Sequence, residues 1–229
     1  MKSSQLCIGR ALFLSLACFF MSASAATYTW TGAQSSIWEN PKNWSPEGLP
    51  TAGDTAVISG VTLTLNSPEA LATLTISNCT INGASLSANS VSASGTNTIN
   101  SILTSVSTFA VQNGITTLNG GTITDGNYII ASGTLIVNGA FTFSGASKIG
   151  GAGNVTFITN QSIVAGQYNV SGTTDVESIA LFNSSSDTWN INPETNVGRI
   201  GKCYSFQFAC IDERNRERRS PKQSRKYQS

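Results

Sequence analysis

Between about residues 57 and 181, apolar and polar residues alternate in short runs separated by turn residues. Alternation with a period of two is typical of β-strands, because successive side chains point to opposite faces of a sheet. No stretch of this region has the longer periodicity of an amphipathic helix. The chain is therefore expected to be all-β.

The apolar pairs recur in groups of three. In the segment 134–157 they are Leu135 with Val137, Phe141 with Phe143, and Ile149. Val155 then begins the cycle again, 20 residues after Leu135. This length suits one three-sided coil whose inward residues stack on those of the next coil.

Asn-Gly pairs stand between several runs: Asn82-Gly83, Asn113-Gly114, Asn119-Gly120 and Asn138-Gly139. Glycine supplies the positive φ that a tight corner needs. Because Asn-Gly is also a strong hairpin signal, a β-sandwich is the alternative. The short, repetitive spacing of the turns favours a single-stranded, right-handed parallel β-helix, that is, a β-solenoid with an N-terminal cap.

The N-terminus resembles a signal peptide. Lys2 and Arg10 are followed by the apolar segment 11–21 and by the small residues Ala23-Ser24-Ala25. Cleavage is expected after Ala25, which places the mature protein outside the cell or at its surface. No second apolar stretch follows, so no integral membrane segment is expected in the mature chain.

Composition divides the chain into four segments: a signal peptide (1–25), a Trp-rich cap module (26–60), the β-solenoid (61–192) and a basic tail expected to be disordered (193–229). The tail has two further interpretations. Its arginines suit an anchor for anionic polysaccharide or lipid. Alternatively, Gly201-Lys202-Cys203 can be encoded by a splice-donor sequence, so the tail can be a translated intron and the chain the beginning of a longer protein.

The cap module carries a spaced set of residues: Trp30-Thr31-Gly32, Trp38, Asn43-Trp44, Gly48, Pro50, Asp54 and Val57-Ile58. This set resembles the beginning of secreted, adhesin-like β-helical proteins with autotransporter-associated β-strand repeats. The resemblance implies a cap and a secreted or surface-exposed protein, and it carries over no catalytic residues.

Charge excludes nucleic acid as a partner of the body. Residues 26–198 contain nine acidic residues and only Lys42 and Lys148 as bases. Nucleic-acid-binding domains need a cationic surface for the phosphates. The expected partners are instead an extracellular polysaccharide or a cell-surface protein.

Candidate sites are few. The chain has no histidine, and Asp175 with Glu177 is the one carboxylate pair on a shared strand face, as a calcium-assisted polysaccharide lyase or a glycosidase would use. No arginine lies between residues 26 and 198 to assist them. We expect no catalytic site, metal or cofactor, and keep Asp175, Glu177 and Trp30 as weak ligand-binding candidates. Trp30 is either an exposed sugar-stacking residue or part of the cap core.

Modification sites depend on the host. Six Asn-x-Ser/Thr sequons are candidates for N-glycosylation in a eukaryotic secretory pathway: Asn43, Asn78, Asn154, Asn160, Asn169 and Asn183. Cys203 and Cys210 are candidates for a disulfide, whereas Cys79, within an apolar-alternating run, is expected in the core.

These features together predict a secreted, non-enzymatic β-solenoid that serves as an extracellular structural, adhesive or binding module. The alternative is a carbohydrate-active β-helix enzyme, or the N-terminal fragment of one, whose candidate carboxylates also include Asp125 and Asp187.

Overall fold

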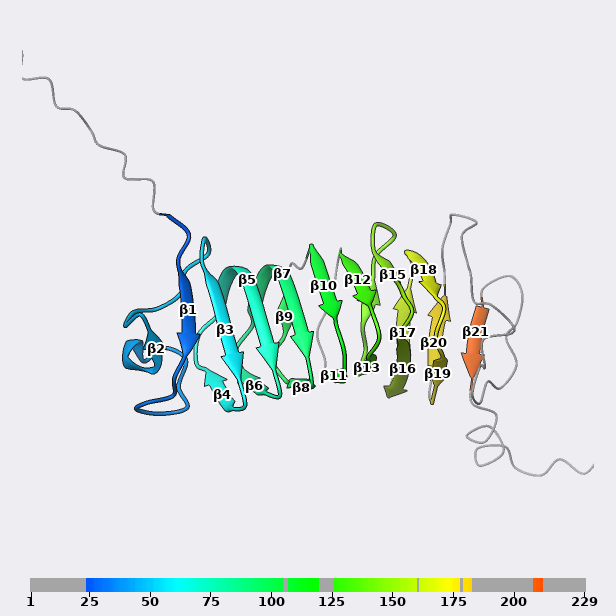
Figure 1. Ribbon diagram of the computed structural model, residues 1–229. Helices are drawn as coiled ribbons and strands as arrows, with labels where there is room; N and C mark the ends of the chain where they lie inside the picture. The colour runs from blue at the N-terminus through cyan, green and yellow to red at the C-terminus, as the bar shows by residue number, and fades with distance from the viewer. Residues whose placement is uncertain are drawn as a thin grey trace, which may run out of the picture.

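The computed structural model describes residues 24–104, 107–119, 126–159, 161–177, 179–182 and 208–211. Regular structure in these ranges is β-strand apart from one 3-10 turn, η1 (Pro41–Asn43), and none of it is a helix long and apolar enough to cross a membrane. Successive coils stack in parallel into a β-solenoid of about six turns (Figure 1). The predicted solenoid is confirmed.

Three sheets run along the solenoid. Sheet A contains, in spatial order, β18 (Gln167–Val170), β15 (Lys148–Gly151), β12 (Asn127–Ile130), β10 (Thr108–Val111), β7 (Leu86–Ser94), β5 (Glu69–Ser77), β3 (Thr55–Ser59), β1 (Thr27–Trp30) and β2 (Trp44–Ser45), with β9 (Leu103–Thr104) beside the start of β7. Sheet B contains β19 (Thr174–Val176), β16 (Asn154–Thr159), β13 (Thr134–Asn138), β11 (Ile115–Leu118), β8 (Thr96–Ile99), β6 (Thr80–Gly83) and β4 (Thr62–Leu65). Sheet C contains β14 (Thr142–Phe143), β17 (Gln161–Val164), β20 (Ile179–Phe182) and β21 (Phe208–Ile211).

The register of the parallel strands measures the length of each coil. It ranges from 17 residues, between Thr73 and Ser90, to 21 residues, between Asn127 and Lys148. Leu135 lies opposite Val155, so the 20-residue coil expected from the sequence is confirmed. The three apolar groups of that coil fall on β13, β14 and β15, one on each sheet.

Alternating burial fills the interior with stacked apolar columns. One column of sheet A comprises Ala56, Leu74, Val91, Phe109, Tyr128, Ile149 and Tyr168, each at most 1% exposed. Phe109 and Tyr128 stack with ring centroids 5.9 Å apart, and Phe143 meets Tyr128 edge-on at 5.3 Å. Because burying one such side chain stabilises a fold by about 1.5 to 3 kcal/mol, these columns are the main stabilising element of the coils.

Glycines make the corners. Three of the four predicted Asn-Gly corners lie in the described residues, and their glycines, Gly83, Gly114 and Gly139, have positive φ. Gly114 has φ +71°, and a Cβ there would collide with the backbone of Gly95 in the preceding coil. A side chain at this corner is therefore excluded both by conformation and by the close stacking of the coils.

The N-terminal end of the stack is covered by the cap module. β1 pairs in parallel with β3, and β2 adds antiparallel to β1. On the other sheet, Thr64 of β4 donates its N–H to Ser36 and accepts from the N–H of Trp38, at 2.9 Å each. The cap thereby satisfies strand edges that would otherwise pair with another chain.

At the other end, β21 pairs antiparallel with β20 (Figure 1, orange). Four residues of the tail that was expected to be disordered therefore form a strand, and its direction does not continue the coil. The rest of the tail lies outside the described residues.

Candidate binding face

The outer face of sheet A carries a column of hydroxyl side chains in register. Its members, on five successive strands, are Thr27, Thr55, Thr73, Ser90 and Thr108. They alternate with buried residues along their strands and are exposed or half-exposed. The column continues with Asn127, Lys148 and Gln167, so every position in it is polar.

A second column runs beside the first. It comprises Thr29, Val57, Thr75, Ser92 and Ala110. On β5 and β7 the two columns form a square of four hydroxyls, with Thr73 and Thr75 opposite Ser90 and Ser92. Strand geometry spaces them about 4.8 Å apart across strands and about 6.6 Å apart along a strand.

The four hydroxyls of this square, hereafter the hydroxyl square, are free to bind a ligand. No side-chain hydrogen bond within the described residues engages Thr73, Thr75, Ser90 or Ser92. Each hydroxyl offers one donor and two acceptor positions. The square is therefore a flat array of unused hydrogen-bonding groups on a rigid sheet.

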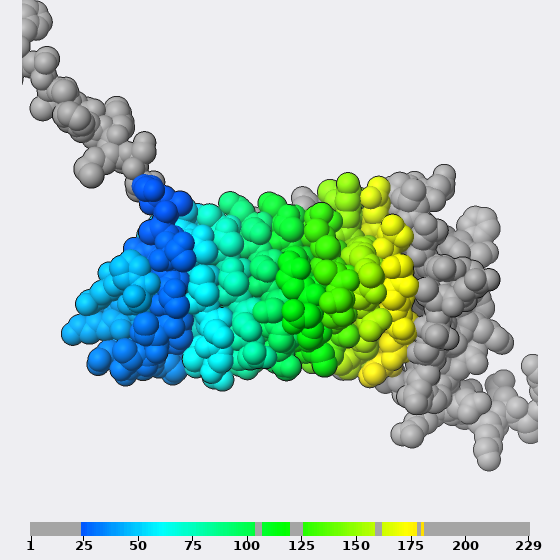
Figure 2. All heavy atoms as spheres, in the orientation of Figure 1, coloured from blue at the N-terminus to red at the C-terminus, as the bar shows by residue number. Residues whose placement is uncertain are grey.

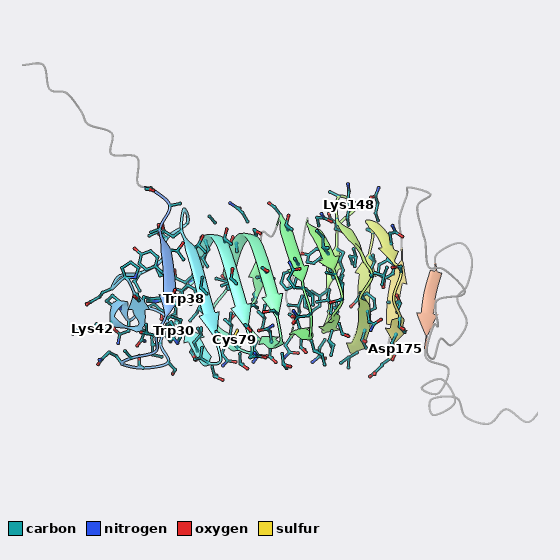
Figure 3. The ribbon with its side chains drawn as sticks, in the orientation of Figure 1. Trp30, Trp38, Lys42, Cys79, Lys148 and Asp175 are labelled. Atoms are coloured by element: carbon teal, nitrogen blue, oxygen red, sulfur yellow. The ribbon has the colours of Figure 1, made fainter. Side chains whose placement is uncertain are left out.

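The surface around the hydroxyl square is uncharged. Between residues 70 and 147 the only ionisable acid or base is Asp125, which lies outside the described residues. Figure 3 shows Lys42 in the cap and Lys148 and Asp175 in the later coils, away from β5 and β7. In the orientation of Figure 2 the coils form one continuous block. The middle coils thus present a neutral polar wall.

Sheet B differs in how its outward groups are used. Thr62, Thr80, Thr98 and Thr117 form one hydroxyl column in register. The neighbouring column is an asparagine ladder in which each Nδ2 donates to Oδ1 one coil earlier: Asn100 to Asn82 at 2.6 Å, Asn119 to Asn100 at 2.6 Å and Asn138 to Asn119 at 2.7 Å. These amides bind one another, so sheet B offers only a single column of free hydroxyls.

Other asparagines close the corner that precedes sheet B. The Oδ1 atoms of Asn78, Asn113 and Asn154 accept backbone N–H groups of Thr96, Gly95 and Thr173 at 2.9, 3.0 and 2.7 Å. Asn78 adopts φ +52°, a conformation that asparagine tolerates better than most residues. These amides stabilise the stack rather than face a ligand.

Trp30 lies in the cap core. Its side chain is 7% exposed, and its ring meets Trp44 edge-on with centroids 4.9 Å apart. Trp38 packs on the same ring at 4.6 Å, and Trp44 Nε1 donates to the Trp38 carbonyl at 2.9 Å. Trp30 therefore has no open face for a sugar, and of its two interpretations the structure supports the core one.

Asn43 anchors the loop that holds this tryptophan cluster. Its Oδ1 accepts from the N–H groups of Gln34 and Ser35 at 2.9 and 3.0 Å. Its Nδ2 donates to Ser35 Oγ at 3.0 Å and to the Ile37 carbonyl at 2.8 Å. The side chain is fully buried and all its hydrogen-bonding capacity is used.

Two glutamates meet where the cap joins the first coil. Burial favours the neutral form of Glu39, but hydrogen bonds from Ser67 and Asn66 outweigh it and hold the pKa of Glu39 below its usual range. Burial, followed by the charge of Glu39, raises the pKa of Glu69. Glu39 thus acts as a clamp on the turn between β4 and β5.

The candidate carboxylates lie on the last coil of sheet B. Asp175 is in β19, opposite Thr156 of β16, and Glu177 directly follows β19 with its side chain exposed. The described residues contain no group of three or more His, Cys, Asp or Glu side chains able to hold a metal ion. Asp125 and Asp187 lie outside the described residues.

The sequons fall into three groups. Asn43 is buried, so a glycan there is incompatible with the folded cap. Asn78, Asn154 and Asn169 are exposed. Asn160 and Asn183 lie outside the described residues.

Cys79 lies in the core, as expected. Its N–H and Sγ both approach Oδ1 of Asn97, at 3.2 and 3.6 Å, and burial raises the pKa of its thiol to about 11. Cys210 belongs to β21, whereas Cys203 lies outside the described residues. The Cys203–Cys210 disulfide stays a prediction.

Comparison with family models, curated proteins and solved structures finds no match to this chain.

Sequence reasoning missed the hydroxyl square. The signal was present in Thr73-Leu-Thr75 and Ser90-Val-Ser92, which alternate hydroxyl and apolar residues 17 positions apart. Without the register, however, nothing shows that these two runs are neighbours.

Proposed function

We propose that the mature protein is a secreted, non-enzymatic β-solenoid that acts as an extracellular binding or adhesive module, and that the outer face of sheet A binds a neutral polysaccharide. The observation that carries this proposal is the hydroxyl square on an uncharged, rigid face. The signal peptide and the resemblance to adhesin-like β-helical proteins also support it.

The chemistry of the face suits a neutral polysaccharide. Such a polymer repeats hydroxyl groups along its length, and a solenoid repeats hydroxyls along its axis. A single hydrogen bond contributes only about 0.5 to 1.5 kcal/mol net. Several bonds made together by linked groups gain affinity through high effective concentration.

The test is retention of the mature chain, residues 26–229, on insoluble polysaccharides. The probes are three neutral polymers (cellulose, chitin and a β-1,3-glucan) and two anionic ones (alginate and polygalacturonate). We expect retention on at least one neutral polymer that persists between about 0.05 M and 1 M salt, because uncharged contacts are not screened. Retention only on the anionic polymers, or on none, would overturn the proposal.

A cell-surface protein is the other class of partner. Binding to protease-treated cell walls that equals binding to untreated walls supports the polysaccharide. Binding that disappears after protease treatment counts against it and assigns the face to a protein partner.

The second candidate function is polysaccharide cleavage. Asp175 and Glu177, two residues apart at the end of sheet B, favour it. Release of reducing ends or unsaturated sugars by the mature chain, lost in Asp175→Ala, would support this function. Absence of product from all five polymers at saturating calcium would count against it.

A further inference from the structure

Ala26 is the point at which the N-terminal segment joins the fold. Its N–H donates to Oδ1 of Asp54 at 2.8 Å, and its carbonyl accepts from the N–H of Thr55, also at 2.8 Å. Ser24 and Ala25, immediately before it, are exposed and belong to no strand. The peptide bond between Ala25 and Ala26 is thus accessible, whereas the atoms after it are held.

Asp54 is a largely buried carboxylate with no cationic partner. It is 7% exposed, and its other oxygen accepts from the N–H and the Oγ1 of Thr51 at 2.8 and 2.7 Å. Within the described part of the chain, these two groups and the Ala26 N–H are its donors, and none of them is charged. Buried carboxylates in proteins are usually matched by hydrogen bonds and by a positive charge.

Cleavage after Ala25 would supply that charge. A signal peptidase hydrolyses the peptide bond: water gives its hydroxyl to the Ala25 carbonyl carbon and a proton to the Ala26 nitrogen. The resulting α-amine has an ordinary pKa of about 7.7 to 8.0, so it takes up a second proton at neutral pH. The nitrogen already lies within hydrogen-bonding distance of Asp54.

We propose that Asp54 is a built-in binding site for the α-ammonium group that processing creates at Ala26, and that this ion pair fastens β1 over the end of the solenoid. The proposal rests on the proposed secretion but not on polysaccharide binding. An ammonium donates up to three hydrogen bonds where the precursor amide donates one, and charge-assisted bonds are the stronger kind. Since β1 carries β2 and pairs with β3, holding its first residue holds the cap.

The site discriminates by position as well as by charge. An N-terminus at Ser24 would leave a neutral amide at the Ala26 nitrogen, with its ammonium two residues away. An N-terminus at Tyr28 would remove the nitrogen altogether. The site therefore selects one processed form, so only the chain beginning at Ala26 is fully fastened.

Four proteins test this proposal: chains beginning at Ala26 or at Ser24, each with Asp54 or with Asp54→Asn. Asparagine keeps a carbonyl oxygen as acceptor and removes the charge. At pH 7 and low salt, the chain beginning at Ala26 should melt about 2 to 4 °C above the chain beginning at Ser24. In the Asp54→Asn pair this difference should disappear. Equal melting temperatures in the Asp54 pair, at any stability of the variants, would overturn the proposal.

The pKa of the Ala26 α-amino group gives a second measurement that needs no variant. NMR of the chain beginning at Ala26 should place it above the ordinary range of about 7.7 to 8.0. A value within that range would contradict the ion pair. N-terminal sequencing of the exported protein should return Ala26 first, and a start downstream of Ala26 would equally overturn the proposal. Failure of polysaccharide binding would leave all three results unaffected.

Discussion

The side-chain amide of Asn100 donates from Nδ2 to Oδ1 of Asn82, one coil earlier, at 2.6 Å. Asn100 in turn accepts from Asn119 at 2.6 Å, so its amide joins three consecutive coils. The ladder holds the corner after sheet B at a fixed register, because each amide needs its partner directly above it.

Asn100→Ala removes two of these hydrogen bonds. The side chain is exposed, so water replaces part of what is lost, and we expect the free energy of unfolding to fall by about 1 to 2 kcal/mol. Asn169→Ala is the matched control, since Asn169 is exposed in β18 without a side-chain hydrogen bond in the described residues. Urea unfolding should leave that control within about 0.5 kcal/mol of the parent. Equal losses in the two variants would show that the ladder contributes nothing.

Asn43→Ala should destabilise the cap more strongly. It leaves the buried N–H groups of Gln34 and Ser35 without their acceptor, and each unsatisfied buried group costs about 1 to 3 kcal/mol. We expect a loss of at least about 2 kcal/mol in urea unfolding, with an earlier change in tryptophan fluorescence because Asn43 positions the loop beside Trp38 and Trp44. A loss no greater than that of Asn169→Ala would contradict the anchor role.

The stabilising effect of Asp54 should depend on pH. Hydrogen bonds from Ala26 and from the Thr51 hydroxyl and N–H hold the pKa of Asp54 below its ordinary value of 3.8. A lowered folded pKa means that the carboxylate stabilises the fold above the unfolded pKa, and that this contribution is lost as pH falls through the folded pKa. Thermal unfolding of Asp54→Asn should therefore lie below that of the parent at pH 7. The two curves should converge below about pH 4, and a constant difference from pH 7 to pH 2 would exclude this explanation.

Cys79 should be unreactive in the folded protein. Its thiol is buried and its pKa is raised to about 11 by that burial, so at pH 8 little thiolate forms and reagents cannot reach it. Peptide mapping after iodoacetamide treatment should find Cys79 unmodified in native protein and fully modified after denaturation in guanidinium. Rapid native labelling would show that the coils open at β6.

The coil length was predictable because apolar residues report the interior directly. Leu135 and Val155 are both large and apolar, and their separation of 20 residues in the sequence is their register in the structure. The inward stacking of Phe141 and Phe143 was visible for the same reason, since only a buried face tolerates two large aromatic residues so close together.

The outward face could not be predicted in the same way. Coil length varies from 17 to 21 residues, so the neighbours of Thr73 are undefined until every preceding corner is placed. The anchors are also long-range: Asp54 meets Ala26 across 28 residues, and Glu39 meets Ser67 across 28 residues. Trp30 remained open because an amphipathic ring in a strand is equally compatible with either face until the cap loop covers it.

The most direct test of the binding face compares two quadruple variants of the mature chain. One removes the hydroxyl square of sheet A: Thr73→Val, Thr75→Val, Ser90→Ala and Ser92→Ala. The other removes the hydroxyl column of sheet B: Thr62→Val, Thr80→Val, Thr98→Val and Thr117→Val. Both keep charge and β-forming tendency, and circular dichroism with thermal unfolding verifies that each is folded.

The measurement is the dissociation constant of each variant for the neutral polysaccharide that retains the parent protein. Loss of four hydrogen-bonding groups from the binding face should weaken binding by at least about tenfold for the sheet A variant. The sheet B variant should stay within about twofold of the parent. Equal weakening in both variants, or a larger loss in the sheet B variant, would contradict the assignment of the binding face to sheet A.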